Sequence, residues 1–125
     1  MKFKVALAAC FCALATPTHA ETCIASQYGG GDGYHGKRAA DGSRFNTYAT
    51  SPYTVAFPPD RVARSHGWRP RPLGAWLVVT NLANGRSIRA RITDRGPFVR
   101  GRCVDLGRAG AAAIGMGGTA RVTVE

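Results

Sequence analysis

The sequence predicts a mainly β domain with one short helix, arranged as a small closed barrel. Two strand-like segments flank an Asn-Gly turn, repeated prolines interrupt residues 45–74, and one alanine-rich stretch near the C-terminus has the composition of a helix. Short strands that bury one face favour a closed barrel, because closure removes unpaired sheet edges.

The first twenty residues have the pattern of an export signal. Lys2 and Lys4 precede an apolar run over residues 5–16, which is too short to cross a bilayer as a mature helix. Thr18-His19-Ala20 suits a cleavage site, so we expect one domain over residues 21–125, located in the periplasm or cell envelope. In an alternative interpretation, Leu7-Ala8-Ala9-Cys10 is a lipoprotein box, and the protein meets the membrane only through a lipid at Cys10.

Two cysteines remain after the signal. Cys23 and Cys103 form an even pair in an exported chain, so we predict a disulfide. Closing a loop of about 80 residues would stabilise the fold by roughly 4–5 kcal/mol in the chain-entropy model. The alternative is two buried free thiols.

The chain is strongly basic, with 17 Lys and Arg against seven Asp and Glu and a net charge of +10. Without Lys2 and Lys4 the charge falls from +10 to +8. Nucleic acid is the usual partner of such a surface, but the export signal argues against it. An anionic envelope polymer or a membrane surface suits the compartment better, and a simple solvated basic face is the third interpretation.

The elements are expected in this order. Residues 24–44 are predicted to be a glycine-rich loop, and Tyr53 to Phe57 an extended segment. Ala75 to Leu82 is predicted to be a strand, followed by a turn at Asn84-Gly85 and a return strand from Arg86 to Asp94.

The C-terminal part is predicted to hold the helix. Cys103-Val104 is expected to be a short strand, and Asp105 to cap a helix over Leu106 to Ile114 that ends at Gly115 or Gly117. Thr119 to Val124 alternates again and is predicted to be the last strand.

Asp94 is the strongest candidate for chemistry, because a rigid strand carries it directly into a Gly-Pro turn. It is either a general acid beside Arg95 and Phe98, or a structural carboxylate that holds the turn. A general acid needs a raised pKa, whereas neighbouring arginines lower the pKa of a carboxyl group.

A second acid is hard to identify from the sequence. Glycosidases use paired carboxylates, and Asp32, Asp41 and Asp60 are predicted to lie in loops. The histidines and cysteines show no metal-ligand spacing, so we expect neither a metal nor a cofactor. Tyr28, Tyr34 and His35 either stack on sugar rings or anchor the glycine-rich loop.

Several segments closely resemble the rare lipoprotein A family of septal-ring lytic transglycosylases. They are Ala25–Gly29, His35–Gly42, Val79–Ser87, Arg91-Ile-Thr-Asp-Arg-Gly-Pro-Phe-Val-Arg-Gly-Arg102, Val104-Asp-Leu106 and Ile114-Gly-Met116. The resemblance covers nearly all of residues 24–125. It implies an exported six-stranded double-psi β-barrel that cleaves peptidoglycan glycan without water and leaves a 1,6-anhydro sugar, with Asp94 as the catalytic aspartate.

Three departures from the family pattern matter. The family's glutamate after Asn-Gly is Ser43 here, and Gln27 replaces a tryptophan. The segment that carries a functional histidine is disrupted by an insertion. One alignment places His66 on that histidine, and the other places Phe57 there and leaves no histidine.

The leading hypothesis is therefore a lytic transglycosylase that cleaves naked glycan strands, with an activity that the loss of the glutamate at Ser43 would weaken or abolish. Asp94 would be the acid/base, assisted by His66, and the candidate sugar contacts are Tyr28, Tyr34, Trp68 and Arg95. Arg95 alternatively only supports the turn. The alternative function is a non-catalytic glycan-binding or wall-loosening module. We expect a monomer with no nucleic-acid partner.

Overall fold

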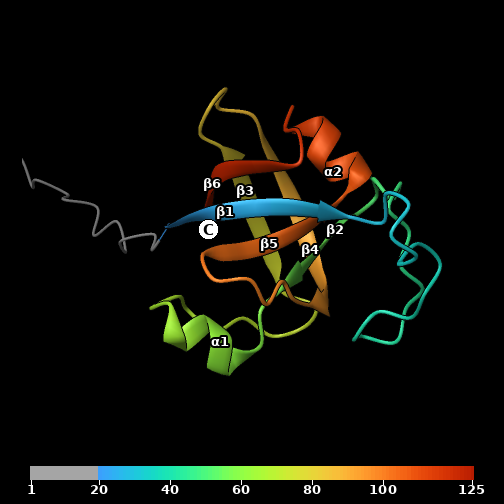
Figure 1. Cartoon of the computed structure of the whole chain (residues 1–125), viewed down its shortest axis with the longest axis horizontal. Helices are drawn as coiled ribbons and strands as arrows, with labels where there is room; N and C mark the ends of the chain where they lie inside the picture. Colours follow the sequence, from blue (N-terminus) through green and yellow to red (C-terminus); the bar gives the residue numbers. More distant parts are fainter. Residues whose placement is uncertain (1–19) are drawn as a thin grey trace, which may run out of the picture.

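The computed structural model describes residues 20–125, which form a six-stranded barrel and two short helices (Figure 1). The strands are β1 Glu21–Tyr28, β2 Tyr53–Phe57, β3 Trp76–Asn81, β4 Ser87–Arg95, β5 Arg102–Gly107 and β6 Thr119–Val124. Apart from Ala20, the predicted export signal lies outside the described residues, as does the alternative lipid anchor at Cys10.

The sheet closes on itself in the order β1-β5-β2-β4-β3-β6. β1 pairs with β5 and β2 pairs with β4 in parallel, while the other four neighbouring pairs are antiparallel. The predicted mainly β closed barrel is confirmed. Its interior is filled by aliphatic side chains that lie fully buried, including Val55, Leu77, Val79, Ile92, Val104, Leu106, Val122 and Val124.

The predicted hairpin is confirmed. β3 and β4 fall within one residue of the expected bounds, and the Gly85 N–H donates to the Asn81 carbonyl at 2.8 Å across the turn. Gly85 has a φ of +74°, which glycine adopts without the steric penalty of a side chain. β2 and β6 also match their predicted ranges.

The predicted loop over residues 24–44 is wrong at its start, because β1 continues to Tyr28. The polar residues Ser26 and Gln27 obscure the alternating pattern of a strand, although Cys23 and Ala25 face the core. β1 is hydrogen-bonded to β5 on one side and to β6 on the other. These pairings stabilise the strand although its own residues have only a weak strand propensity. β5 is likewise longer than the expected Cys103-Val104.

The prediction of one helix is also wrong, because α1 spans Asp60–Ser65 within the proline-rich segment. The prolines bound this helix and do not interrupt it, since Pro59 is its N-cap residue and Pro70 follows it. Asp60 in the first turn and Arg64 in the last turn complement the helix dipole. Neither helix among the described residues has the length and apolar character needed to cross a bilayer.

α2 spans Arg108–Ala113 and is shorter than predicted. Its N-cap residue is Gly107, so the expected cap at Asp105 is wrong. Buried Thr47 takes that role from a distant loop. Its hydroxyl accepts from the Arg108 N–H at 2.7 Å, and its carbonyl accepts from the Ala109 N–H at 2.9 Å.

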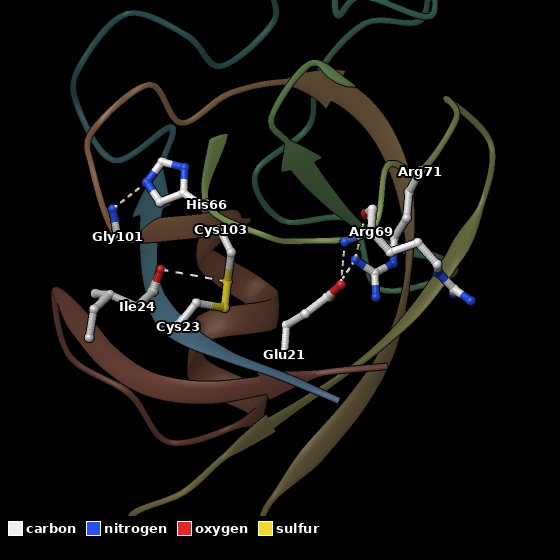
Figure 2. Close-up of a disulfide and its surroundings, with 8 residues drawn as sticks. All are labelled: Glu21, Cys23, Ile24, His66, Arg69, Arg71, Gly101 and Cys103. Atoms are coloured by element: carbon white, nitrogen blue, oxygen red, sulfur yellow. Dashed lines mark hydrogen bonds and ion pairs between the residues drawn. A yellow bond between two sulfur atoms is a disulfide. The ribbon is translucent and has the colours of Figure 1, made fainter. Parts of the chain in front are cut away.

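The predicted disulfide between Cys23 and Cys103 is confirmed (Figure 2). It joins β1 to β5 with a Cα–Cα distance of 5.8 Å and a sequence separation of 80. A bond between two parallel neighbours fixes the start of both strands, and β1 and β5 lead from there to Tyr28 and Gly107 at the opposite end.

A β-bulge in β4 sets the direction of Asp94. Val55 pairs with Ile92 and the next residue, Ala56, pairs with Asp94, so Thr93 is the extra residue. Val55 and Ile92 belong to the barrel core, whereas Ala56 packs in a separate outer cluster. The bulge therefore turns Asp94 to the outer face, where strict alternation from Ile92 would have placed it in the core.

Candidate active site

Asp94 is half-buried near the end of β4, on the outer face of the barrel. Its Oδ1 atom accepts hydrogen bonds from the Ala40 N–H at 3.0 Å and from the Arg95 N–H at 2.9 Å. No guanidinium is paired with this carboxylate in residues 20–125, because the single ion pair found there joins Arg71 to Glu21. Asp94 is held by backbone amides, and its second oxygen makes no hydrogen bond within the described chain.

The amide of Ala40 reaches Asp94 from the tip of a small hairpin over residues 36–45. Its two sides are joined by backbone bonds such as Gly36 N–H to the Phe45 carbonyl at 2.8 Å. At the tip, the Asp41 N–H also donates to the Thr93 carbonyl at 3.1 Å. The hairpin therefore docks directly on the bulge that presents Asp94.

Asp105 is the functional candidate that sequence reasoning missed. It faces outward from β5, and its Oδ1 atom accepts from the Ser26 hydroxyl at 2.7 Å. Burial raises the pKa of the Asp105 carboxyl above its ordinary value, against the opposing effects of the Ser26 hydroxyl and Arg102. The sequence pattern that could have identified Asp105 is the alternation of Val104, Asp105 and Leu106, in which two apolar residues flank an acid as in a strand with one buried face.

The sheet places the two acids in one row. Ala56 of β2 pairs with Asp94 on one side and with Asp105 on the other, so the acids are two strands apart. Neighbouring strands lie about 4.8 Å apart, which sets their Cα atoms roughly 10 Å from each other. The row thus holds two carboxylates that the sequence did not place together.

Tyr28 lies in the outer cluster with Ala56 and Phe45, and its ring stacks on Phe45 with a centroid distance of 4.0 Å. Only 7% of Tyr28 is exposed, and its hydroxyl is buried with no hydrogen-bond partner in residues 20–125. Burial, followed by the charges of Asp94 and Asp105, raises the pKa of Tyr28. The ring is thus unavailable for sugar stacking, and the hydroxyl is buried beneath the surface.

Four of the seven acidic residues of this basic chain contribute to the raised pKa of Tyr28. After Asp94 and Asp105, the more distant charges of Asp32 and Asp41 also raise the pKa of this phenol. Asp32 accepts from the Gly29 N–H at 2.9 Å and fixes the loop that follows β1.

His66 and Trp68 lie elsewhere, beside the start of β5 (Figure 2 shows His66). The His66 Nε2 atom accepts from the Gly101 N–H at 2.9 Å, and its Nδ1 atom lies 3.0 Å from the Val62 carbonyl oxygen. Trp68 is 9% exposed, and His66 stacks on it at 4.2 Å. Neither residue makes a hydrogen bond to Asp94 in the described chain, and Trp68 lies buried with one ring face covered by His66.

The remaining predicted contacts differ in exposure. The Arg95 guanidinium donates to the Arg71 carbonyl at 2.9 Å, which fits the turn-supporting alternative. Tyr34 is 55% exposed and meets Tyr28 edge to face at 6.1 Å, so it remains available to a ligand. Phe57, the alternative to His66 in the family alignment, is fully buried one residue beyond Ala56.

Ser43, which stands where the family has its glutamate, is exposed on the hairpin of residues 36–45. Its hydroxyl and its N–H both contact the Asp41 Oδ1 atom, at 2.5 Å and 2.9 Å. No group of three or more potential metal-binding side chains was found in residues 20–125. The chemistry available here is that of carboxylates, a phenol and backbone amides.

The closed six-stranded barrel is a double-psi β-barrel, with two acids in one row on its outer face. The chain belongs to the lytic transglycolase family, whose model matches residues 20–125. It is 43% identical over 104 residues to the probable endolytic peptidoglycan transglycosylase RlpA of Nostoc sp., covering 82% of this chain and 24% of that protein. It is 38% identical over 104 residues to the endolytic peptidoglycan transglycosylase RlpA of Campylobacter jejuni, covering 82% of this chain and 32% of that protein.

The chain thus spans about a quarter to a third of these relatives. Two solved structures share the fold. The apo expansin of Clavibacter michiganensis has a TM-score of 0.58 at 17% identity, over 85% of this chain and 49% of that one. The Streptomyces papain inhibitor has a TM-score of 0.57 at 21% identity, over 86% of this chain and 94% of that one. At these identities the likeness concerns the barrel alone.

Proposed function

We propose that this protein is a lytic transglycosylase that cleaves peptidoglycan glycan strands outside the cytoplasm. The bond broken lies between N-acetylmuramic acid and N-acetylglucosamine, and the product is a 1,6-anhydro sugar. Family membership supports the reaction class. The single observation that carries the proposal is the outer row of Asp94, Ala56 and Asp105, which brings two acids in different environments to one site.

The two environments suggest a division of labour. Burial raises the pKa of Asp105, so this carboxyl keeps its proton to higher pH and is suited to protonate the leaving glycosidic oxygen. Asp94 accepts two backbone N–H bonds at its Oδ1 atom, and its second oxygen makes no hydrogen bond in residues 20–125, so this oxygen is free to take up a proton. Asp94 is therefore suited to act as the base.

The bond changes balance without water. Asp105 gives a proton to the glycosidic oxygen as the bond from that oxygen to C1 of muramic acid breaks. The 6-hydroxyl oxygen of the same sugar attacks C1, and its proton passes to Asp94. Because nucleophile and reacting carbon belong to one ring, no water has to be positioned. Proton exchange with solvent then restores both acids.

In this proposal, residues outside the pair of acids bind the sugar or hold the structure around the site. Exposed Tyr34 contacts the sugar, whereas buried Tyr28 packs with Phe45 and Ala56 beneath the site. His66 holds the loop before β5 through its bond from Gly101 and does not exchange protons with substrate. The enzyme acts as a monomer in the periplasm or envelope.

A second candidate, a non-catalytic glycan-binding module, is favoured by Ser43. This residue offers no acid at the position of the family glutamate, and its hydroxyl is engaged by Asp41. In the proposed mechanism Asp105 supplies the second acid, so the absence of that glutamate does not remove the proton donor.

Digestion of peptidoglycan freed of stem peptides separates the two functions. Mature protein should release 1,6-anhydro products, and Asp94→Asn should lower the rate by about 10²–10⁴-fold. The matched control is Asp60→Asn, an exposed acid on α1, which should act like the wild type. Protein that pellets with glycan but releases no product would establish the binding module, and full activity in Asp94→Asn would refute the site.

A further inference from the structure

A shallow hollow of about 740 Å³ lies on the outer face of the barrel, away from the two acids. Residues 50–53, at the start of β2, form one wall, and Trp76 and Arg89 form the other. Trp76 is 43% exposed at the start of β3, which is unusual for the largest apolar side chain in a small domain.

The Arg89 guanidinium lies over the Trp76 ring, 4.2 Å from its centroid. Stacking uses the face of the guanidinium and leaves its in-plane N–H groups free to donate. Arg89 has no carboxylate partner in residues 20–125, where the ion pair between Arg71 and Glu21 is the single one found. The hollow therefore offers an aromatic surface beside an arginine with unused donors.

Backbone pairing connects the strands that line the hollow to the strands that carry the proposed active site. Trp76 pairs with Arg91 of β4, and Arg91 pairs with Thr54, two residues before Ala56 in β2. Exposed Arg89 and Arg91 share one face of β4. Arg89 precedes Asp94 by five residues, roughly 16 Å along the strand. That distance exceeds one sugar unit, so a single strand of several sugars can reach both places.

We infer that the hollow formed by residues 50–53, Trp76 and Arg89 is a distal subsite for a muramic acid residue with a free lactyl carboxylate. The apolar face of the sugar packs on Trp76, and the carboxylate accepts hydrogen bonds from Arg89. A stem peptide converts this carboxylate to an amide, which removes the charge that Arg89 recognises. The inference rests on the proposed glycan substrate and adds to it a second contact that selects denuded strands.

The test measures binding in the Asp94→Asn background, where no strand is cleaved. Long denuded strands should bind the Trp76→Ala and Arg89→Gln variants at least about fivefold more weakly than they bind the Asp94→Asn parent. Strands too short to reach the hollow should bind the parent and both variants with equal affinity. Arg89→Gln should also lose the preference for denuded strands over strands with stem peptides. Leu82→Ala and Arg121→Gln, two exposed changes away from the hollow, should bind like the parent.

Three results would overturn the subsite: unchanged affinity in Trp76→Ala, a loss that is the same for short and long strands, or an equal loss in Arg121→Gln. Parent protein that binds no glycan would also overturn it. Product release is measured separately with Asp94 intact. If the protein with Asp94 releases 1,6-anhydro sugar but the Trp76→Ala change leaves the binding of long strands unaltered, the subsite is refuted and the proposed reaction is not.

Discussion

Asp94 and Asp105 flank the same residue of β2, because Ala56 pairs with Asp94 in β4 and with Asp105 in β5. The methyl group of Ala56 gives Tyr28 and Phe45 room to pack over this strand. The phenol therefore lies close to both acids, and the backbone pairing of three strands fixes the distance between the acids.

The first prediction concerns Asp105 as the proton donor. Asp105→Asn should lower the release of 1,6-anhydro product by about 10²–10⁴-fold. Because the donor must be protonated, the wild-type rate should fall as the pH rises through the raised pKa of Asp105. Initial rates across pH provide the measurement. Wild-type rates that persist in Asp105→Asn would assign the acid role to another group.

The second prediction concerns the pH dependence of stability. The folded pKa of Asp105 is raised above its unfolded value, so the stabilising contribution is complete below the unfolded pKa and is lost as the pH rises through the folded pKa. Asp105→Asn removes the charge but keeps an acceptor for Ser26. The variant should therefore melt at higher temperature than the wild type at neutral pH, with a difference that shrinks in acid. A constant difference across pH would contradict this reasoning.

The third prediction concerns the Tyr28 hydroxyl, which is buried with no partner in the part of the chain that the structure describes. Tyr28→Phe should leave the free energy of unfolding unchanged or raise it by up to about 1 kcal/mol, because an unsatisfied polar group is removed. Glycan affinity should stay unchanged, because the hydroxyl is buried and does not reach the surface. Tyr48→Phe is the control, since Tyr48 is exposed. A loss of glycan affinity in Tyr28→Phe would contradict this reasoning and place the hydroxyl against the substrate.

The fourth prediction separates His66 from the reaction. His66→Ala removes the acceptor of the Gly101 N–H and the stacking partner of Trp68, so it should destabilise the fold by about 1–3 kcal/mol. Product release per folded molecule should persist below the melting temperature. Loss of activity with unchanged stability would instead place this histidine in the catalytic machinery.

The fifth prediction concerns the buried ion pair between Glu21 and Arg71, whose closest N–O distance is 2.6 Å (Figure 2). Arg71 is 3% exposed and also lies over the Phe57 ring at 5.0 Å. Glu21→Gln leaves this guanidinium without a counter-charge and should cost about 3–5 kcal/mol in urea unfolding. Glu125→Gln, an exposed acid at the other end of the chain, should have no measurable effect.

The sequence predicted the elements whose signals are local. The Asn84-Gly85 turn, the β-branched strands around it and the alternation of Thr119 to Val124 all appear where expected. β1 was missed because its pairing partners, β5 and β6, lie far away in sequence. α1 was missed because prolines that border a helix resemble prolines that interrupt one.

The site was harder to predict than the fold, because it depends on register. Alternation from Ile92 alone would send Asp94 into the core, and only the bulge at Thr93 reverses it. Asp105 resembled a helix cap because it precedes the alanine-rich segment, while the actual cap, Thr47, comes from a loop some sixty residues earlier. Both errors arise from contacts across strands that no local pattern records.

The hydrogen bond from the Ala40 amide to Asp94 couples the tip of the hairpin over residues 36–45 to the charge of the proposed base. A neutral carboxyl is a poorer acceptor, so protonation of Asp94 weakens the attachment of this tip. The Ala40 amide is thus a built-in spectroscopic probe, whose NMR resonance and hydrogen-exchange rate report the ionisation of Asp94 in the resting protein without any sugar present.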